Sequence, residues 1–509
     1  MKFPRSKRFF LFIGILSFAV FILSARFLEK PRVLELDEVP IVFWAWRTDA
    51  PTAADLQKAF AATKAKTLFL RTGQFDVIDG SVRRIRPVTG TIPAVAELHL
   101  VYNGTRKFLR EWDEMATGMI AESVAASYIA DVERARGDHA EVTGLQLDLD
   151  IPERLLPRYA QMLARLRELL PSGTRLSITG LPSWMASDDI RIVLANVDFW
   201  IPQCYGSTIP TGINQKIPIS LPSDIRRTVG KARRLKKPFY AGLSAYGYAI
   251  LYAKDGSLSE LRGDIDPALA SQNASLELVE TGSFNGVENE SEMRYVYRAK
   301  SDTVLDGLII QPGETLVFDV PNAASLRAAA RAVRENAGDS LLGICVFRLP
   351  VADDKTNLGI AEIAAALTDT RTIAATALTL ETLADGKLKL SAKNTGTAST
   401  ILTDDALTID LYVPAGAING VSGLTGFTAF ETLCGGREIN TPHPCSPLRA
   451  NVVRLKSRSW RPGLNASVIF TVKNALPESL TALVTTHIDD GKIRRESFEL
   501  NPYDTRKTK

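Results

Sequence analysis

The chain has 509 residues, of which 45% are hydrophobic and 23% are charged, and its net charge is +4. This length exceeds one ordinary hydrophobic core, so we expect a globular protein of two or more domains. The basic residues are scattered along the chain, which excludes the concentrated basic face of a nucleic-acid-binding protein.

The N-terminus carries a membrane-targeting pattern. A basic tail at residues 1–8 precedes an uncharged run at residues 9–25, and a linker at residues 26–37 follows. The seventeen residues of the run, rising about 1.5 Å each, just cross a hydrocarbon core of about 30 Å. The basic end is expected to stay in the cytoplasm, which predicts a single-pass anchor in a bacterial inner membrane with the bulk of the chain in the periplasm. The alternative is a cleaved signal peptide, which would export the chain.

Eight strand-like apolar runs follow and alternate with amphipathic helical patterns. The strand-like runs are residues 41–47, 67–72, 96–102, 144–150, 175–181, 197–205, 239–246 and 343–349. The helical patterns include residues 53–63, 154–170, 224–235 and 325–336. This alternation predicts a closed (β/α)₈ barrel of the TIM type over residues 38–369. An open doubly wound sheet is the alternative, but no Gly-rich phosphate turn follows an early strand, and we expect no cofactor.

Two regions depart from this alternation. The interval from about residue 249 to 320 is longer than a barrel loop needs. It contains alternating segments at 293–299 and 303–320, and the second segment is predicted to turn at Pro312-Gly313. We predict a β-rich insertion after the seventh strand. From 372 to 505 the pattern changes to short alternating strands separated by turn residues, which is typical of a C-terminal β-sandwich.

Cys434 and Cys445 flank a short loop rich in Gly and Pro. In an oxidising compartment this pair predicts a disulfide, which contributes up to about 3 kcal/mol by closing a short loop. A zinc site that includes His443 is the alternative, but it lacks a fourth ligand, and no other His or Glu cluster has metal-ligand spacing. We therefore predict no metal.

The fourth strand-like run, GLQLDLD, holds the candidate catalytic residues. Gln146, Asp148 and Asp150 share one face because strand side chains alternate, and in a barrel strand this face points inward. Two carboxylates spaced about 6.6 Å apart at their α-carbons repel each other, which raises one pKa and provides the protonated acid that glycoside cleavage requires. The alternative role for Asp150 is helix capping, although Ile151 before Pro152 suits the cap position better.

The strand motifs resemble two families. The fourth run resembles the D-G-x-D-x-D-x-E signature of glycoside hydrolase family 18, the chitinase-like barrels. VDFWIPQCYG, AGLSAYG and LGICVFRL resemble the sixth, seventh and eighth strands of that family. The chain resembles still more closely a bacterial family of unknown function, numbered 3142, which implies a distant kinship to sugar hydrolases.

The resemblance implies roles for several residues. Asp150 takes the place of the general acid, and Asp148 that of the aspartate that orients the acetamido group of the substrate and stabilises charge. Tyr205 takes the place of the tyrosine that binds the same group. The other predicted substrate-binding residues are Gln146, Gln203, Tyr246 and the aromatic residues Trp44 and Phe347.

The expectation is therefore a glycoside hydrolase-like protein acting on an envelope or extracellular polysaccharide, and the resemblance implies acetamido sugars in that polysaccharide. The sequence also departs from the chitinase-like pattern, because Asp150 replaces the longer glutamate and Thr143 the first aspartate. The alternative is a carbohydrate-binding or scaffold protein with a degenerate barrel.

Overall fold

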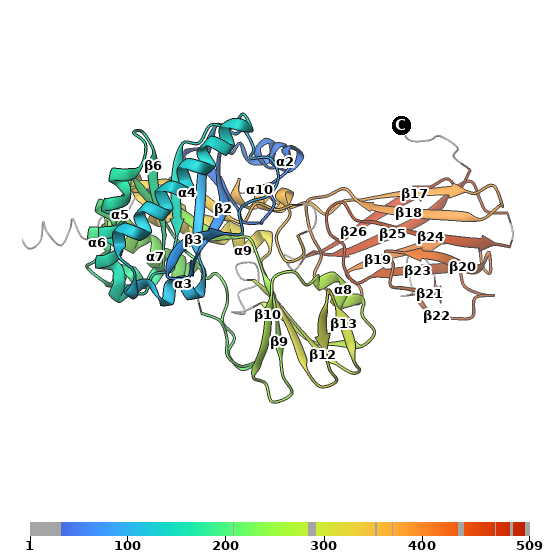
Figure 1. The fold of residues 1–509 in the computed structure, drawn as a ribbon. Coiled ribbons are helices and arrows are strands. Elements are labelled where there is room, and N and C mark those ends of the chain that lie inside the picture. Colours follow the sequence, from blue (N-terminus) through green and yellow to red (C-terminus); the bar gives the residue numbers. More distant parts are fainter. Residues whose placement is uncertain are drawn as a thin grey trace, which may run out of the picture.

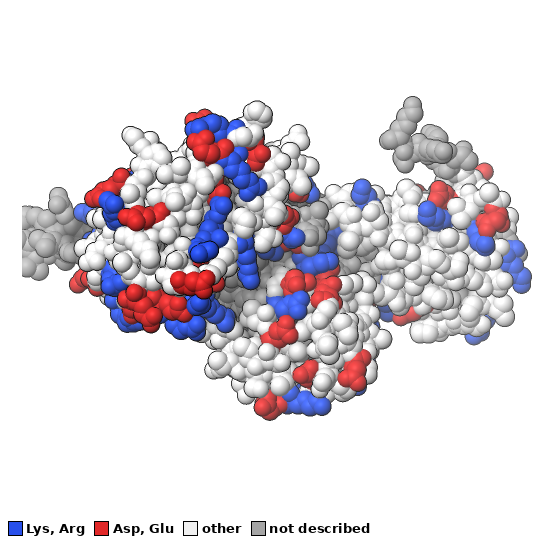
Figure 2. All heavy atoms as spheres, in the orientation of Figure 1, with Lys and Arg blue, Asp and Glu red and all other residues white. Residues whose placement is uncertain are grey.

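The computed structural model describes residues 32–206, 208–283, 292–351, 354–368, 370–435, 442–473, 475–488 and 492–503. Figure 1 shows three bodies: a barrel with helices, a β-rich lobe below it, and an elongated β-body that ends the chain. In the space-filling view a hollow lies where the barrel meets the β-rich lobe (Figure 2).

Eight parallel strands close the barrel. They are β1 (Ile41–Ala45), β2 (Thr67–Ile78), β4 (Glu97–Gly104), β5 (Gly144–Asp148), β6 (Arg175–Gly180), β7 (Phe199–Pro202), β8 (Phe239–Ser244) and β16 (Leu341–Phe347). Their order around the barrel is β1-β16-β8-β7-β6-β5-β4-β2, and β2 pairs with β1 again. The predicted closed barrel is confirmed, and each of its strands overlaps one of the eight predicted runs.

Helices cover the outside of most of the barrel. They are α2 (Ala53–Thr63), α4 (Thr117–Gly137), α5 (Leu156–Leu169), α6 (Ile190–Ala195), α7 (Pro222–Arg234), α9 (Ala323–Asn336) and α10 (Ile360–Leu367), with the short α3 (Arg106–Arg110) before α4. Thr52 caps α2 by accepting a hydrogen bond from the backbone N–H of Asp55, and Asn322 caps α9 in the same way. The first helix therefore spans the predicted 53–63.

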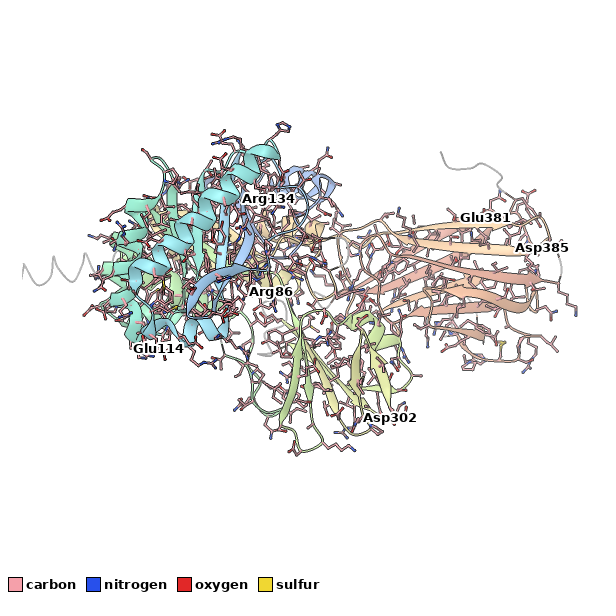
Figure 3. The ribbon with its side chains drawn as sticks, in the orientation of Figure 1. Arg86, Glu114, Arg134, Asp302, Glu381 and Asp385 are labelled. Atoms are coloured by element: carbon pink, nitrogen blue, oxygen red, sulfur yellow. A yellow bond between two sulfur atoms is a disulfide. The ribbon has the colours of Figure 1, made fainter. Side chains whose placement is uncertain are left out.

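The connection between β2 and β4 differs from the predicted strand–helix alternation. Residues 79–96, all of them described, form the strand β3 (Ser81–Ile85) instead of a helix, and β3 pairs antiparallel with the end of β2. Arg134 of α4 donates hydrogen bonds to the carbonyls of Val88 and Gly90, which anchors the segment that follows β3. Figure 3 labels Arg86 at the end of this strand, on the side of the barrel that faces the β-rich lobe.

Aromatic side chains fill the interior of the barrel. The ring of Phe69 on β2 lies 6.3 Å from that of Trp44 on β1 and 4.7 Å from that of His99 on β4. It also lies 6.2 Å from Phe199 and 6.1 Å from Tyr240, on the opposite strands β7 and β8. Side chains two residues further along each strand therefore point inward one layer closer to the carboxyl ends.

The β-rich lobe is the insertion predicted after the seventh strand. Its main sheet has the order β10-β9-β15-β12-β11, with β9 (Tyr248–Tyr252), β10 (Leu258–Arg262), β11 (Leu276–Ser283), β12 (Met293–Ala299) and β15 (Thr315–Val320), and it includes helix α8 (Pro267–Gln272). The segment 303–320 turns twice, because β13 (Thr303–Leu305) and β14 (Leu308–Ile310) form a hairpin before Pro312. Asp306 and Gly307 adopt positive φ angles of 46° and 79° at that hairpin turn, which the Asp-Gly pair suits.

The C-terminal body consists of two antiparallel sheets that enclose a core of its own. One sheet has the order β17-β18-β24-β20 and the other β22-β21-β23-β19-β25-β26. Their strands are β17 (Thr376–Thr382), β18 (Leu388–Asn394), β19 (Leu407–Tyr412), β20 (Ile418–Thr425), β21 (Ala429–Cys434), β22 (His443–Pro444), β23 (Val452–Ser457), β24 (Asn465–Val472), β25 (Leu480–His487) and β26 (Ile493–Leu500). A disulfide joins Cys434 to Cys445, the pair that the loop spacing indicated.

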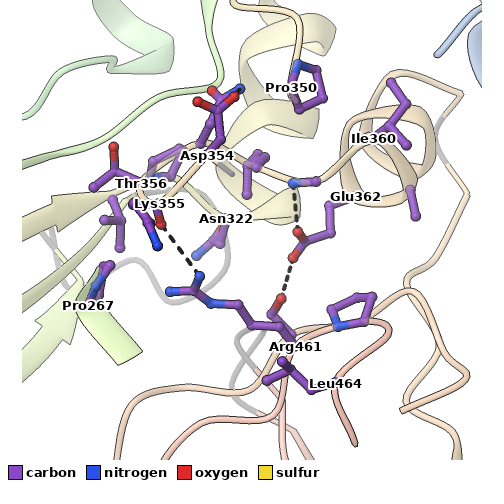
Figure 4. A pocket seen from close by; sticks show the side chains of 18 of the residues that line it. Pro267, Asn322, Pro350, Asp354, Lys355, Thr356, Ile360, Glu362, Arg461 and Leu464 are labelled. Atoms are coloured by element: carbon purple, nitrogen blue, oxygen red, sulfur yellow. Dashed lines mark hydrogen bonds between the residues drawn. The ribbon is translucent and has the colours of Figure 1, made fainter. Parts of the chain in front are cut away.

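The three bodies meet at a junction that contains a cavity of about 390 Å³. Arg461 of the C-terminal body donates to the backbone carbonyl of Lys355 in the barrel (Figure 4). It also pairs at 3.1 Å with Asp266 of the insertion. Ser399 donates to the carboxylate of Glu362 on α10 at 2.6 Å. The junction thus joins the C-terminal body to both other bodies through buried and half-buried polar contacts.

The predicted basic tail, anchor and most of the linker fall at residues 1–31, outside the described residues. Within the described ranges, no helix has both the length and the apolar character that crossing a bilayer requires.

We predict that Gly144→Ala destabilises the barrel. A Cβ at Gly144 would lie 2.3 Å from Nδ1 of His99 and 2.6 Å from the carbonyl oxygen of Arg175. Such overpacking costs about 1–3 kcal/mol, so the melting temperature should fall. Gly230→Ala on α7 is the matched control, because its Cβ would meet nothing within 4 Å and should stabilise the helix by up to about 1 kcal/mol. An unchanged melting temperature for Gly144→Ala would contradict the close approach of β4, β5 and β6.

Candidate active site

The two predicted acids lie at the carboxyl end of β5. The strand ends at Asp148, whereas we expected it to continue to Asp150. The chain leaves the sheet there because the N–H of Ile151 bonds the carbonyl of Leu149 at 2.8 Å, and Pro152 has no N–H to offer a neighbour. Trp184 holds this turn from the next loop, since its indole N–H donates to the carbonyl of Ile151 at 2.9 Å.

Asp148 is half-buried and hydrogen-bonded to the neighbouring strands. Thr179 on β6 donates to its Oδ1 at 2.6 Å, and Gln203 after β7 donates to the same oxygen at 3.5 Å. Burial and the charge of Asp150 raise the pKa of the Asp148 carboxyl to about 7, although the two hydrogen bonds act in the opposite direction. This carboxyl therefore exchanges its proton near neutral pH.

Asp150 is exposed at the rim of the mouth, in the turn after β5. Loss of solvation by the surrounding walls nevertheless raises the pKa of its carboxyl. The capping role is not seen, because Pro152 occupies the N-cap of the short 3₁₀ helix Glu153–Leu155 and Leu155 that of α5. Asp150 is thus an accessible carboxyl close enough to Asp148 for the two charges to interact.

Aromatic side chains from β16 and from the loops that follow β7 and β8 gather at the same mouth. The ring of Phe347 lies 6.0 Å from Tyr205 and 5.3 Å from Tyr246, and the two tyrosine rings lie 6.2 Å apart. All three side chains are partly exposed. The charges of Asp148 and Asp150 contribute to the raised pKa of the Tyr205 hydroxyl, which burial chiefly causes, so Tyr205 lies near both carboxyls.

Trp44 and Gln146 lie one layer below the mouth. Trp44 is 1% exposed and Gln146 is fully buried. The indole N–H of Trp44 donates to Oε1 of Gln146 at 2.6 Å, and Nε2 of Gln146 donates to Ser177 at 3.3 Å. These two predicted substrate-binding residues thus contact each other beneath the open part of the site, whereas Tyr205, Gln203, Tyr246 and Phe347 reach the mouth.

Sequence reasoning missed several residues of the mouth. Trp46 follows β1 and lies 5.4 Å from the ring of Phe347, and Thr179 binds Asp148. Asn103 pairs in register with Asp148, and its Oδ1 is buried without a partner among the described residues. Strand alternation could have identified two of them, because Trp46 is two residues after the inward-facing Trp44 and Thr179 is two residues after the inward-facing Ser177.

Tyr159 on α5 is a further residue near the acids. Its hydroxyl is buried and has no hydrogen-bond partner in the described part of the chain. Burial, followed by the charges of Asp148 and Asp150, raises the pKa of this hydroxyl. No sequence pattern singled out Tyr159, because it lies on the buried face of an ordinary amphipathic helix.

Two further polar residues of the barrel strands and their approaches have structural partners. His99 is fully buried, stacks on Phe69, and bonds Glu97 at 3.1 Å. Asp198, which matched the sixth-strand motif, accepts hydrogen bonds from the N–H of Leu176 and from Arg167, before β7 begins. Within the described ranges, no three His, Cys, Asp or Glu side chains gather as a metal site requires.

The family model of the domain of unknown function 3142 matches residues 115–279, which include β5 to β8 and both acids. This match confirms the resemblance that the strand motifs indicated. The matched region begins near α4 and ends within the insertion.

The chain is similar, at low sequence identity, to three solved structures among others. The spore cortex-lytic enzyme SleL of Bacillus megaterium QM B1551 is 14% identical, with a TM-score of 0.42, covering 65% of this chain and 74% of that one. A chitinase from Chromobacterium violaceum ATCC 12472 is 15% identical, with a TM-score of 0.42, and the match covers 65% of this chain and 99% of that one. The chitinase-like agglutinin of Robinia pseudoacacia is 13% identical, with a TM-score of 0.39, and the match covers 63% of this chain and 99% of that one. No curated protein matches the chain. Such low identity assigns no activity, and the assignment of the barrel fold depends on the strand pairings of this chain itself.

We predict that Asp148→Asn stabilises the protein at alkaline pH. The folded-state pKa of about 7 exceeds the ordinary value of 3.8, so the folded protein holds an extra proton between these two values. Stability therefore falls as pH rises through this window, and the variant lacks that loss. Its melting temperature should exceed that of the wild type by about 2 °C or more at pH 8, and the gain should shrink towards pH 4. A difference that does not vary with pH would contradict the raised pKa.

Proposed function

We propose that the chain is a glycoside hydrolase-like enzyme acting on an envelope or extracellular polysaccharide. The observation that carries the proposal is the pair Asp148 and Asp150 in one barrel mouth, with the pKa of both carboxyls raised. Glycoside cleavage needs one carboxyl that keeps its proton near neutral pH next to an ionised partner. Active sites of (β/α)₈ barrels lie at this end of the strands.

Each residue has a role in this proposal. Asp150 is the accessible carboxyl, and it donates the proton to the glycosidic oxygen. Asp148, held by Thr179 and Gln203, shares a proton with Asp150. When Asp150 carries the proton, the ionised Asp148 stabilises the positive charge that develops on the sugar. Tyr205 hydrogen-bonds a substituent of the sugar, an acetamido group in the case that the sequence resemblance implies.

The aromatic side chains provide the binding surface. Tyr246, Phe347 and Trp46 present partly exposed apolar rings, which suit the flat faces of sugar rings. Trp44 and Gln146 support this surface from below through their hydrogen bond. We propose that the N-terminal segment anchors the protein in the bacterial inner membrane, with the barrel in the periplasm, or that its cleavage exports the chain.

The second candidate is a carbohydrate-binding or scaffold protein that does not cleave its ligand. One observation on Asp150 favours this binding role: no hydrogen bond within the described residues fixes the orientation of its carboxyl. General acid catalysis depends on a proton held within hydrogen-bond reach of the leaving oxygen. Binding through the aromatic rings needs no such alignment.

We predict that Asp150→Asn abolishes cleavage. The purified full chain is incubated with acetamido-sugar oligomers and bacterial exopolysaccharides, and new reducing ends are measured. Loss of a general acid lowers the rate by about 100-fold or more. Asp150→Glu keeps a carboxyl and should retain activity, and Asp339→Asn, exposed before β16 at the opposite end of the barrel, should have no effect. Tight binding without turnover by the wild type would favour the second candidate.

We also predict that kcat/KM falls as pH rises above about 7. Below this pH the two carboxyls share one proton, and above it both are ionised, so no acid remains to protonate the glycosidic oxygen. A pH–rate profile, measured with the oligomer that is cleaved fastest, tests this fall of kcat/KM at high pH. An activity that still increases at pH 9 would show that another group supplies the proton.

A further inference from the structure

Arg71 is a buried guanidinium in the barrel interior. It lies on β2 two residues after Phe69, whose ring occupies the centre of the barrel, so Arg71 points inward one layer closer to the mouth. Its residue is 5% exposed, and its Nη1 has no hydrogen-bond partner in the described part of the chain. A buried charge without a partner costs several kcal/mol, so its retention suggests that a ligand provides the partner.

Arg86 brings a second positive charge to the same place. It lies between Ile85, which pairs with Gln74 of β2, and Val88, whose N–H donates to the carbonyl of Thr72 at 2.9 Å. Arg86 is therefore adjacent to the stretch of β2 that follows Arg71. Burial, and then the charge of Arg86, lower the pKa of the Arg71 guanidinium.

Other arginines at this end of the barrel already have carboxylate partners. Arg348 after β16 pairs with Asp354 at 2.6 Å, and Arg47 lies 3.8 Å from the same carboxylate. Arg84 on β3 pairs with the buried Asp131 of α4. Arg71 differs from these three, because no salt bridge joins it to a carboxylate among the described residues and the charge that acts on it, that of Arg86, has the same sign.

The two arginines are separated from the two acids by a single strand. Around the mouth, Arg71 lies on β2, Asn103 on the adjacent β4, and Asp148 on the next strand, β5. Asn103 offers a buried Oδ1 that also lacks a partner among the described residues. A bound sugar that reaches Asp150 can therefore extend a substituent across Asn103 towards Arg71.

We propose that Arg71 and Arg86 form a subsite for a carboxylate group carried by the sugar bound in the mouth. The planar guanidinium fork matches the two oxygens of a carboxylate, and the buried position strengthens the hydrogen bonds. The inference rests on the proposed sugar site, and it adds that the ligand is an acidic saccharide. The carboxylate comes either from a uronic acid or from a carboxyethyl ether on an acetamido sugar.

The test compares binding of three oligosaccharides of equal length to the full chain by calorimetry. They are a hexuronic acid oligomer, an acetamido-sugar oligomer with carboxyethyl ethers, and a neutral acetamido-sugar oligomer. At least one acidic oligomer should bind about tenfold or more tightly than the neutral one, and added salt should reduce this preference. The oligomer that binds tighter identifies the source of the carboxylate.

Variants distinguish a ligand contact from a structural role. Arg71→Gln and Arg86→Gln should each remove most of the preference, whereas Arg226→Gln, an exposed arginine on α7, should leave it unchanged. Arg71→Lys keeps the charge but loses the fork, so an intermediate affinity is expected. Arg71→Gln should not lower the melting temperature of the free protein, because it removes an unpaired buried charge.

Binding and cleavage report on different proposals. Preferential binding of an acidic oligomer without cleavage would support the carboxylate subsite and overturn the proposed enzyme. Cleavage with equal affinity for acidic and neutral oligomers would support the enzyme and overturn the subsite. The subsite is also overturned if Arg71→Gln lowers the melting temperature and keeps the preference, since Arg71 would then have a structural role.

Discussion

The pairing of β1 with both β2 and β16 closes the sheet, and the site depends on this closure. Because all eight strands run in one direction, their carboxyl ends form a single mouth. Asp148 on β5, Tyr205 after β7 and Phe347 on β16 meet there although they are far apart in the sequence. An open sheet made from the same strands would leave these residues along an edge, and the aromatic wall would lie away from the acids.

Burial in this mouth acts on acids and bases in opposite ways. It raises the pKa of the Asp148 and Asp150 carboxyls, and it lowers that of the Arg71 guanidinium. The two kinds of group do not neutralise each other, because β4 separates β2 from β5. The barrel thus holds two carboxyls with raised pKa and, one strand away, a buried guanidinium that no carboxylate among the described residues neutralises.

The sequence predicted the strands better than the connections between them. Alternation and apolar runs located all eight barrel strands, and helical spacing of apolar residues located α2. The helix α4 has no comparable signal, since many of its buried residues are alanines, and β3 is too short for its alternation to stand out. The Asp306-Gly307 turn was hidden inside an apolar run, although the dipeptide itself indicates a hairpin.

The candidate site divides in the same way. The residue pattern by itself determined that Gln146 and Asp148 share a face of β5 and that Cys434 can reach Cys445, because both depend on local spacing along the chain. Only the tertiary structure decided that Gln146 bonds Trp44 below the mouth, that Thr179 holds Asp148, and that Nη1 of the buried Arg71 has no hydrogen-bond partner among the described residues. These contacts join different strands of the closed barrel, and strand spacing carries no information about which side chain of another strand lies opposite.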